Sequence, residues 1–329
     1  MLEVRKMDKI AQLKELVDER IKSIPIDQKR GNLYDPIRYI LDLGGKRFRP
    51  ILTLLSYSLF KDDYDAFVEP ALGTEVFHNF TLIHDDIMDN APLRRSMPTV
   101  HMKWKEETAI LSGDTMLVLA YQLIMKNQVS TLRGLDAFND CGIGVCEGQQ
   151  LDMDYEEKEH VTIAEYLEMI RLKTAVLLGF CMELGAIGAS ASDEDCASAR
   201  SFGQNLGIGF QLQDDILDVF GEHQKVGKQV GGDIIANKKT YLWIKANELA
   251  NAEQKALIAD WASKDTFDPG EKVAAIKKIY NESGVLDHAK GEMDLYFAKA
   301  WKDLDQISVD DNRKDELRSF SSRLIKRDQ

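Results

Sequence analysis

Apolar residues recur at three- and four-residue intervals along most of this chain, which is the spacing of one face of a helix. Segments 162–179 and 197–220 are examples. No stretch rich in valine, isoleucine and threonine alternates in the way that a half-buried strand does. The pattern therefore predicts many helices and little or no strand.

Proline placement supports the same fold class, because helix interiors exclude proline strongly. The chain has seven prolines, and none lies between residues 99 and 268. No repeat, low-complexity tract or shift in composition marks a boundary between domains. We therefore expect an all-α protein, a bundle of about ten or more helices in one domain that covers residues 1–329.

Composition narrows the class of protein further. With 329 residues, 44% of them hydrophobic, the chain is long enough to bury a large core. A net charge of −13 argues against nucleic acid as a partner. The four cysteines form no CxxC pair and lie among small or apolar residues, so we expect reduced thiols and a cytoplasmic location. These residues are Cys141, Cys146, Cys181 and Cys196.

Targeting and membrane segments are not expected. The first 20 residues alternate charged and apolar positions at helical spacing, unlike a signal peptide. No segment has the roughly 18 uninterrupted apolar residues of a membrane span.

Two carboxylate clusters share one spacing, Asp85-Asp86-Ile-Met-Asp89 and Asp214-Asp215-Ile-Leu-Asp218. A helix places the first and last aspartate of each cluster on one face, one turn apart. Like charges at that spacing destabilise an isolated helix, so a cation is expected between the clusters. Hard oxygen ligands without nearby cysteine indicate Mg²⁺, which usually keeps waters and completes its shell with substrate phosphate.

Cations follow glycines at residues 44–50, GGKRFRP. The glycines are expected to end one helix, and Pro50 suits the first turn of the next. Lys46, Arg47 and Arg49 would then be presented beside a helix N-terminus, a favourable place for a diphosphate. A solvated basic turn is the alternative for this motif alone.

Further basic and polar residues accompany the aspartates. Arg94-Arg95 follow the first cluster and offer bidentate donors to phosphate, and His78 lies two turns before Asp85 on nearly the same face. Lys173-Thr174 interrupt an apolar helix, where a lysine must reach solvent or pair with an anion. A glycine-rich loop with further cations follows the second cluster, as one did the first; its basic residues are Lys225, Lys228, Lys238 and Lys239.

In this order and spacing the motifs closely resemble the trans-isoprenyl diphosphate synthase family. They run from GGKRFRP through LIHDDIMDN, RR, PTVH, GD, GQ, KT and QLQDDILD to GK and GGDI. The resemblance implies a helical bundle around a deep central cavity, usually a homodimer. It also implies two aspartate-rich helices that face each other and hold about three Mg²⁺ against an allylic diphosphate.

The resemblance assigns roles motif by motif. Asp85 and Asp89 match the first metal-ligand set and Asp214 the second, with Asp86, Asp215 and Asp218 completing the two motifs. The cations for the allylic diphosphate are Arg94, Lys173, Lys228 and Lys238. The pocket for isopentenyl diphosphate is formed by Lys46, Arg49, His78 and Arg95. Thr174 and Gln211 would line the developing carbocation. Asn237 departs from the family pattern, since many bacterial members have glycine there.

The implied reaction is a prenyl transfer. The allylic partner is dimethylallyl, geranyl or farnesyl diphosphate. Once its diphosphate group is neutralised by Mg²⁺ and cationic side chains, that group departs, and the allylic cation that remains requires a dry cavity. Isopentenyl diphosphate, held alongside, attacks with its double bond, and loss of a proton restores the alkene. A terpene cyclase, a silent regulatory subunit and a purely structural protein are the alternatives. Both aspartate clusters and the Lys46/Arg49 pair argue against them.

Product length is expected to depend on residues below the first aspartates. Thr81 and Phe77 lie one and two turns before Asp85, at about 5.4 Å per turn, and Phe80 lies in the intervening turn. The small side chain of Thr81 would let the growing prenyl chain pass, while Phe80 and Phe77 could form the floor of the cavity that holds it. Plain core packing is the alternative. An aromatic residue at position 80 resembles family members that make products of fifteen or twenty carbons. Geranylgeranyl diphosphate is favoured over farnesyl diphosphate as a hypothesis.

Overall fold

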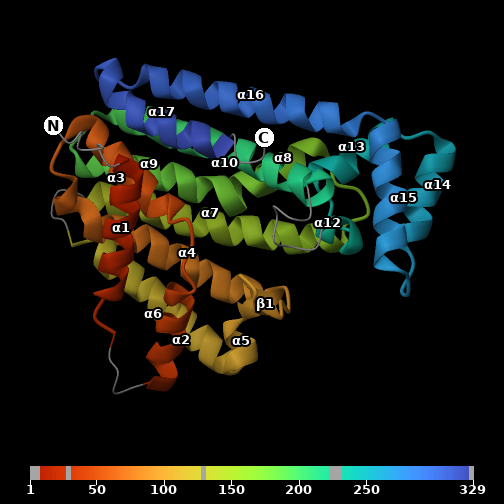
Figure 1. Ribbon diagram of the computed structural model, residues 1–329, viewed down its shortest axis with the longest axis horizontal. Coiled ribbons are helices and arrows are strands. Elements are labelled where there is room, and N and C mark those ends of the chain that lie inside the picture. Colours follow the sequence, from red (N-terminus) through yellow and green to blue (C-terminus); the bar gives the residue numbers. More distant parts are fainter. Residues whose placement is uncertain (1–7, 27–30, 127–130, 222–230, 326–329) are drawn as a thin grey trace, which may run out of the picture. The chain divides into compact units, whose positions relative to one another are not determined.

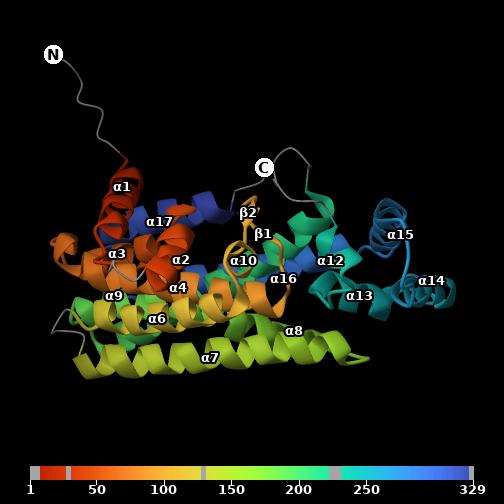
Figure 2. The ribbon, with the colours of Figure 1, turned by 90° about the horizontal axis from the view of Figure 1, so that it is seen from below.

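The computed structural model describes residues 8–26, 31–126, 131–221 and 231–325, and these are mostly helical (Figures 1 and 2). The predicted all-α class is confirmed. The chain divides into two compact units, and the divisions fall inside helices rather than in loops. Unit 1 comprises Met1–Cys141, Phe180–Arg200 and Gln306–Phe320, and unit 2 comprises Gly142–Gly179, Ser201–Asp305 and Ser321–Gln329. The single domain over residues 1–329 stays a prediction.

Unit 1 holds the N-terminal elements and parts of later helices. Its elements are α1 (Lys9–Lys22), α2 (Gly31–Asp42), α3 (Phe48–Phe60), η2 (Tyr64–Phe67), α4 (Val68–Met88), β1 (Leu93–Arg94), β2 (Met97–Pro98), α5 (Val100–Lys103) and α6 (Glu106–Ile124), with the start of α7 (Thr131–Glu157), the end of α9 (Val176–Gly188), the start of α10 (Asp193–Phe220) and most of α17 (Asp311–Ile325).

Helix α4 lies beside α6 along most of its length (Figures 1 and 2). The two backbones approach closely, because a Cβ added at Gly73 of α4 would lie 2.6 Å from Cγ1 of Ile124 at the end of α6. The end of α4 is a Schellman turn: the Asn90 N–H donates to Ile87 and the Ala91 N–H to Asp86. Asn90 has φ 49°. This stop fixes where the first aspartate cluster ends.

Unit 2 contains the rest of the chain. Its elements are the remainder of α7, α9, α10 and α17, then α8 (Ile163–Ile170), the π-helical turn η4 (Arg171–Ala175), α12 (Gly232–Ile235), α13 (Tyr241–Leu249), α14 (Ala252–Ala262), α15 (Pro269–Glu282) and all but the last residue of α16 (Val285–Gln306).

Helix α8 begins where its sequence predicts. The Thr162 hydroxyl accepts from the Glu165 N–H, and the Glu165 carboxylate accepts from the Thr162 N–H, which is a capping box. From that start the apolar face of α8 packs into a cluster with α10, α13 and α15, represented by Leu212, Leu242 and Ile276. The unit is thus built on a continuous core that holds α8, η4 and the end of α10 together.

Candidate active site

In unit 1 the first aspartate cluster occupies the end of α4, and its three carboxylates differ in exposure. Asp86 is 1% exposed, Asp85 is half-buried and Asp89 is exposed. The Arg94 guanidinium donates to Asp86 through Nε at 3.0 Å and through an NH2 group at 2.5 Å, and lies 3.7 Å from Asp85. Burial raises the pKa of Asp86, while Arg94 opposes that rise. Asp86 therefore positions Arg94.

A two-strand hairpin presents Arg94 and Arg95. Strand β1 pairs antiparallel with β2, and the two turn residues, Arg95 and Ser96, have φ 54° and 62°. Hairpin turns with two positive φ values usually contain asparagine or glycine. Holding other residues there costs on the order of 1–3 kcal/mol each, and such strain is typical of functional sites. The chain therefore accepts a strained turn at Arg95.

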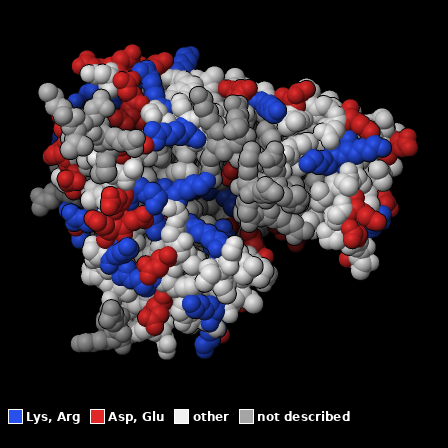
Figure 3. Space-filling model, viewed as in Figure 1, with Lys and Arg blue, Asp and Glu red and all other residues white. Residues whose placement is uncertain are grey.

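Arg49, His78 and Arg95 gather around the glycine turn of unit 1. The Arg95 guanidinium lies against Gly45, where an added Cβ would be 3.0 Å from it. Burial, followed by the charges of Arg49 and Arg95, lowers the pKa of His78 well below its ordinary value, so His78 is neutral. Nε of Arg49 is buried and has no hydrogen-bond partner among the described residues. Arg49 and His78 are half-buried and Arg95 is exposed, so these donors can reach an anion. Figure 3 shows lysine and arginine side chains at the surface over α1 to α4.

The expectation that Arg47 belongs to this cationic group is wrong. Arg47 has φ 53° and is 5% exposed, with its guanidinium turned inward. It donates to Asp18 at 2.9 Å, to Glu75 at 2.7 Å and to the Leu41 carbonyl at 2.8 Å. The left-handed backbone reverses the direction of this side chain, so Lys46, which is exposed, and Arg49 remain to face a ligand.

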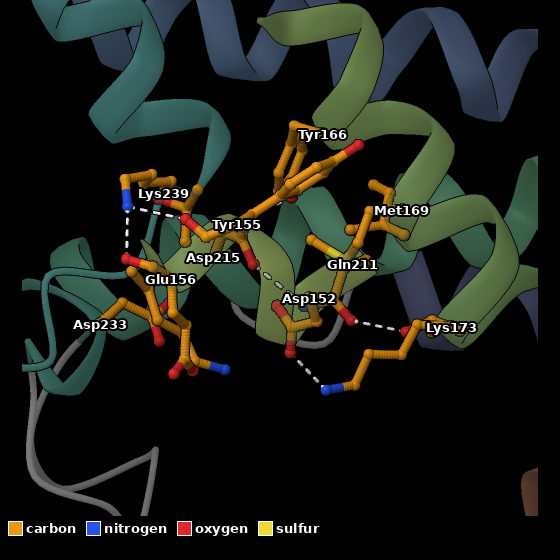
Figure 4. Close-up of a pocket in the computed structure, with 14 residues that line it drawn as sticks. Asp152, Tyr155, Glu156, Tyr166, Met169, Lys173, Gln211, Asp215, Asp233 and Lys239 are labelled. Carbon is orange, nitrogen blue, oxygen red and sulfur yellow. Dashed lines mark hydrogen bonds and ion pairs between the residues drawn. The ribbon is translucent and has the colours of Figure 1, made fainter. Parts of the chain in front are cut away.

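The second aspartate cluster lies at the end of α10 in unit 2, beside a pocket (Figure 4). Asp215 is buried and accepts from the Tyr166 hydroxyl and from Gln211 Nε2 at 3.0 Å; the Thr174 hydroxyl donates to Gln211 Oε1 at 3.2 Å. Burial, and next the charge of Asp233, raises the pKa of Asp215 to about 8. Thr174, Gln211 and Asp215 thus form one hydrogen-bonded chain at the pocket wall.

Lys173 points into the same pocket and toward Asp152, whose carboxylate accepts from its ammonium at 2.5 Å (Figure 4). Of the two expectations for this lysine, reaching solvent or pairing with an anion, the structure shows pairing with Asp152; its role toward a diphosphate stays a prediction. Lys173 and Thr174 lie on the π-helical turn η4, a feature often found at functional sites. A Cβ at Gly148 would lie 2.2 Å from the Lys173 backbone nitrogen. Glycine there lets α7 approach η4.

The remaining residues of the second motif have distinct surroundings. Asp214 is exposed, whereas one Asp218 oxygen accepts from the Asp233 N–H at 3.0 Å. Lys238 and Asp233 line the pocket. Lys239 donates to the carbonyls of Tyr155 and Glu156, near the end of α7. Lys225 and Lys228 lie outside the described residues.

The carboxylates of each unit, taken by itself, are of the kind that binds magnesium. Within the described ranges, no three acidic, histidine or cysteine side chains are grouped so that they alone could hold a metal ion. Mg²⁺ is commonly held by one or two carboxylates, with waters and substrate phosphates completing the shell. Asp85 and Asp89 in unit 1, and Asp214 in unit 2, offer oxygens of that kind.

The three predicted chain-length residues lie on α4 in unit 1. Phe77 is 1% exposed and packs edge-on against Phe138, with ring centroids 5.0 Å apart. Phe80 contacts it at 5.5 Å, and the Thr81 hydroxyl donates to the His78 carbonyl at 2.8 Å. Phe80 and Thr81 are half-buried. Core packing therefore accounts for Phe77, and the role of all three in product length stays a prediction.

Sequence reasoning missed Tyr166, Glu75 and Lys272. Tyr166 lies seven residues before Lys173, a two-turn spacing that could have indicated a shared face. Glu75 and Lys272 carried no such signal, because each is recognised only by its buried partners in the folded chain.

Comparison with known proteins identifies the class. Residues 30–282 match the polyprenyl synthetase family model, so the chain belongs to the polyprenyl synthetase family. It is a prenyltransferase. It is 36% identical over 304 residues to a geranylgeranyl diphosphate synthase of Methanosarcina mazei, covering 92% of each chain. It is 33% identical over 339 aligned positions to a geranylfarnesyl diphosphate synthase of Natronomonas pharaonis, covering 97% of this chain and 96% of that one.

Solved structures agree with that family. A crystal structure of a geranylgeranyl pyrophosphate synthase is 40% identical, with a TM-score of 0.93 over 98% of this chain and 100% of that one. A geranylgeranyl pyrophosphate synthase of Corynebacterium glutamicum, complexed with isoprenyl diphosphate and magnesium, is 26% identical, with a TM-score of 0.84 over 98% and 99% of the two chains.

Among the helices described here, none is long and apolar enough to span a bilayer.

Proposed function

We propose that this prenyltransferase condenses isopentenyl diphosphate with an allylic diphosphate to give geranylgeranyl diphosphate. The observation that carries the proposal is the group of Arg49, His78 and Arg95 around Gly45, in the same unit as the first aspartate cluster. Two guanidinium groups in the same unit as carboxylates that can bind magnesium favour a substrate that carries a diphosphate.

Isopentenyl diphosphate is assigned to one group of residues in unit 1: Lys46, Arg49, His78 and Arg95. Arg49 and Arg95 offer charged donors, and exposed Lys46 adds a third positive charge. Neutral His78 donates one hydrogen bond without adding to the repulsion among these cations. These contacts hold the diphosphate of the nucleophile so that its double bond is presented in one orientation.

The allylic diphosphate is assigned to the remaining cations. Hydrogen bonds to Asp86 orient Arg94, and a hydrogen bond to Asp152 orients Lys173. Lys238 lines the pocket of unit 2. Lys228 is assigned here by family resemblance. Asp85, Asp89 and Asp214, completed by Asp215 and Asp218, would hold magnesium, which when bound neutralises the leaving diphosphate.

Ionisation of the allylic substrate leaves a carbocation that needs oxygen dipoles and no nucleophile. The Thr174 and Gln211 side chains are already fixed by their mutual hydrogen bond at 3.2 Å and by the bond of Gln211 to Asp215. Fixed dipoles stabilise developing charge without reorganising during the reaction. Attack by the isopentenyl double bond and loss of a proton, to the released diphosphate, complete the transfer.

The proposal of a twenty-carbon product is supported by the relatives and by residues of α4. Three of the four proteins compared above are named for geranylgeranyl diphosphate or pyrophosphate. Half-buried Phe80 and Thr81 lie on α4 ahead of Asp85, where an elongating chain would pass.

A homodimer is also proposed. Leu111 and Val118 of α6 and Met125, the residue that follows this helix, recur every seven residues and are 59%, 58% and 52% exposed. A stripe of large apolar side chains at that spacing lies along one side of a helix and is typical of a packing surface. The second copy of this chain is the partner that matches such a surface.

The reduced cysteines support a cytoplasmic location.

The assignment of the two substrates is tested by steady-state kinetics. Arg95→Met is expected to raise KM for isopentenyl diphosphate by about tenfold or more, because a charged hydrogen-bond donor is lost, and to leave KM for the allylic substrate nearly unchanged. Lys173→Met should show the reverse pattern. An equal rise in both constants for either variant contradicts the assignment.

A further inference from the structure

Lys272 on α15 is a lysine with no exposed surface. Its ammonium donates to the Ile235 carbonyl at 3.1 Å and to Asn237 Oδ1 at 2.7 Å, and lies 4.3 Å from the centroid of the Phe267 ring. Both acceptors are neutral. Burial lowers the pKa of this lysine.

Burying an ammonium group costs several kcal/mol unless it is paired or well hydrogen-bonded. Methionine would fill the same volume without that cost. The ammonium group of Lys272 therefore contributes the hydrogen bonds that methionine cannot make. They end on one short segment, the turn after α12, where the Ile235 carbonyl belongs to the last residue of that helix.

The turn that Lys272 holds is strained at Asn237. Asn237 has φ 54°, a left-handed backbone that glycine adopts freely and asparagine adopts less readily. The Asn237 side chain is fixed on both sides, because its oxygen accepts from Lys272 and its amide donates to the Ala262 carbonyl at 3.2 Å. This pair of contacts selects the left-handed conformation.

The conformation of Asn237 determines the direction of the residues that follow. The Lys238 N–H donates to the Asp233 carbonyl at 2.9 Å, and Lys238, Lys239 and Thr240 all line the pocket of unit 2. Lys239 is bound to the end of α7, so the turn is held at Asn237 from α15 and at Lys239 from α7. Lys238 lies between these two fixed points.

We propose that Lys272 is a positioning residue for diphosphate binding: by holding Asn237 it directs Lys238 into the pocket. The proposal rests on the proposed function for the role of Lys238. Lys272 itself contacts no substrate, because it has no exposed surface.

The kinetic test uses Lys272→Met, with Lys278→Met on the same helix as the matched control. The Lys278 side chain is 75% exposed and lies 3.7 Å from Glu282. Lys272→Met is expected to raise KM for the allylic diphosphate by about tenfold and to change KM for isopentenyl diphosphate by less than about twofold. Lys278→Met should match the wild-type protein. Equal effects on both substrates, or no effect of Lys272→Met, overturn the proposal.

Asn237→Ala reaches the same turn without altering the buried lysine, and keeps the proposal testable if Lys272→Met folds poorly. It should give the same split in KM. In a double-mutant cycle, Lys272→Met with Asn237→Ala should be no worse than the more affected single variant. Additive losses would show that Lys272 acts elsewhere and overturn the proposal.

Amide hydrogen exchange of the folded chain separates this inference from the proposed function. Lys272→Met should speed exchange in the peptide that covers residues 236–240 by about tenfold, and Lys278→Met should not. Unchanged exchange overturns the positioning role whether or not the enzyme turns over. A wild-type protein that forms no product, with exchange altered as expected, contradicts the proposed function alone.

Discussion

Neighbouring cations in one short motif have different roles in the fold. Arg47 and Arg49 are two residues apart, yet Arg47 is bound to Glu75 and Asp18 while Nε of Arg49 has no partner among the described residues. The sequence predicted a cationic turn but not this division, because the side-chain direction depends on the positive φ of Arg47. The aspartates were easier to predict, because helical spacing alone places Asp85 and Asp89 one turn apart.

Thr81 and Phe77 provide a prediction about product length. Thr81→Phe should shorten the main product, because an aromatic ring then occupies the helix face below Asp85. Phe77→Ala should lengthen it, and should also lower the free energy of unfolding by about 3–5 kcal/mol, since Phe77 is 1% exposed. Mass spectrometry of the products is the measurement. Unchanged product lengths in both variants would refute the proposed role of this face.

Cys181 provides a prediction about pH. Burial raises its pKa from 9.0 to about 11, despite the nearby charge of Arg49. The unfolded thiol then loses its proton at lower pH than the folded one, so this contribution to stability is complete below pH 9 and is lost as pH rises to about 11. At pH 8, iodoacetamide should modify exposed Cys146 and leave Cys181 intact, as measured by peptide mass spectrometry. Equal labelling of the two thiols contradicts this account.

Local features within helices and strands position several residues of the candidate site. The sequence predicted that Lys173-Thr174 lie within a helical segment, and this is confirmed. It did not predict the π-helical turn at Lys173 or the strained hairpin at Arg95. Propensity does not specify such features, because neighbouring helices and hydrogen bonds stabilise them against the local preference.

Two glycines of α7 form a matched pair for testing one such contact. A Cβ at Gly148 would lie 2.2 Å from the backbone of Lys173, while a Cβ at Gly142 meets nothing within 4 Å. Gly148→Ala should therefore destabilise the protein by about 1–3 kcal/mol and weaken allylic diphosphate binding. Gly142→Ala should stabilise it by about 0.5–1 kcal/mol, because alanine favours a helix. Chemical denaturation measures both, and equal effects would contradict the close approach of α7 to η4.

For the whole molecule, the ordered motifs predicted the family, because they occur in sequence and need no knowledge of packing. The all-α class also followed from apolar spacing and proline placement. The division into two compact units could not be predicted, since its boundaries fall inside continuous helices such as α7 and α10, where neither composition nor proline changes.

The apolar stripe of α6 provides a prediction about assembly. Val118→Lys places a charge among exposed apolar side chains and should shift the protein from dimer to monomer in size-exclusion chromatography with light scattering. Leu295→Lys, at a residue of α16 that is 47% exposed, is the control and should leave the dimer intact. A wild-type protein that is monomeric at micromolar concentration would contradict the proposed dimer.

Product analysis after incubation with radiolabelled isopentenyl diphosphate and each allylic starter tests the central claim most directly. With Mg²⁺ present, label should enter a twenty-carbon allylic diphosphate with release of inorganic diphosphate, and EDTA should abolish the transfer. Absence of any elongated product with all three starters, or transfer that persists unchanged in EDTA, would contradict a magnesium-dependent prenyl transfer.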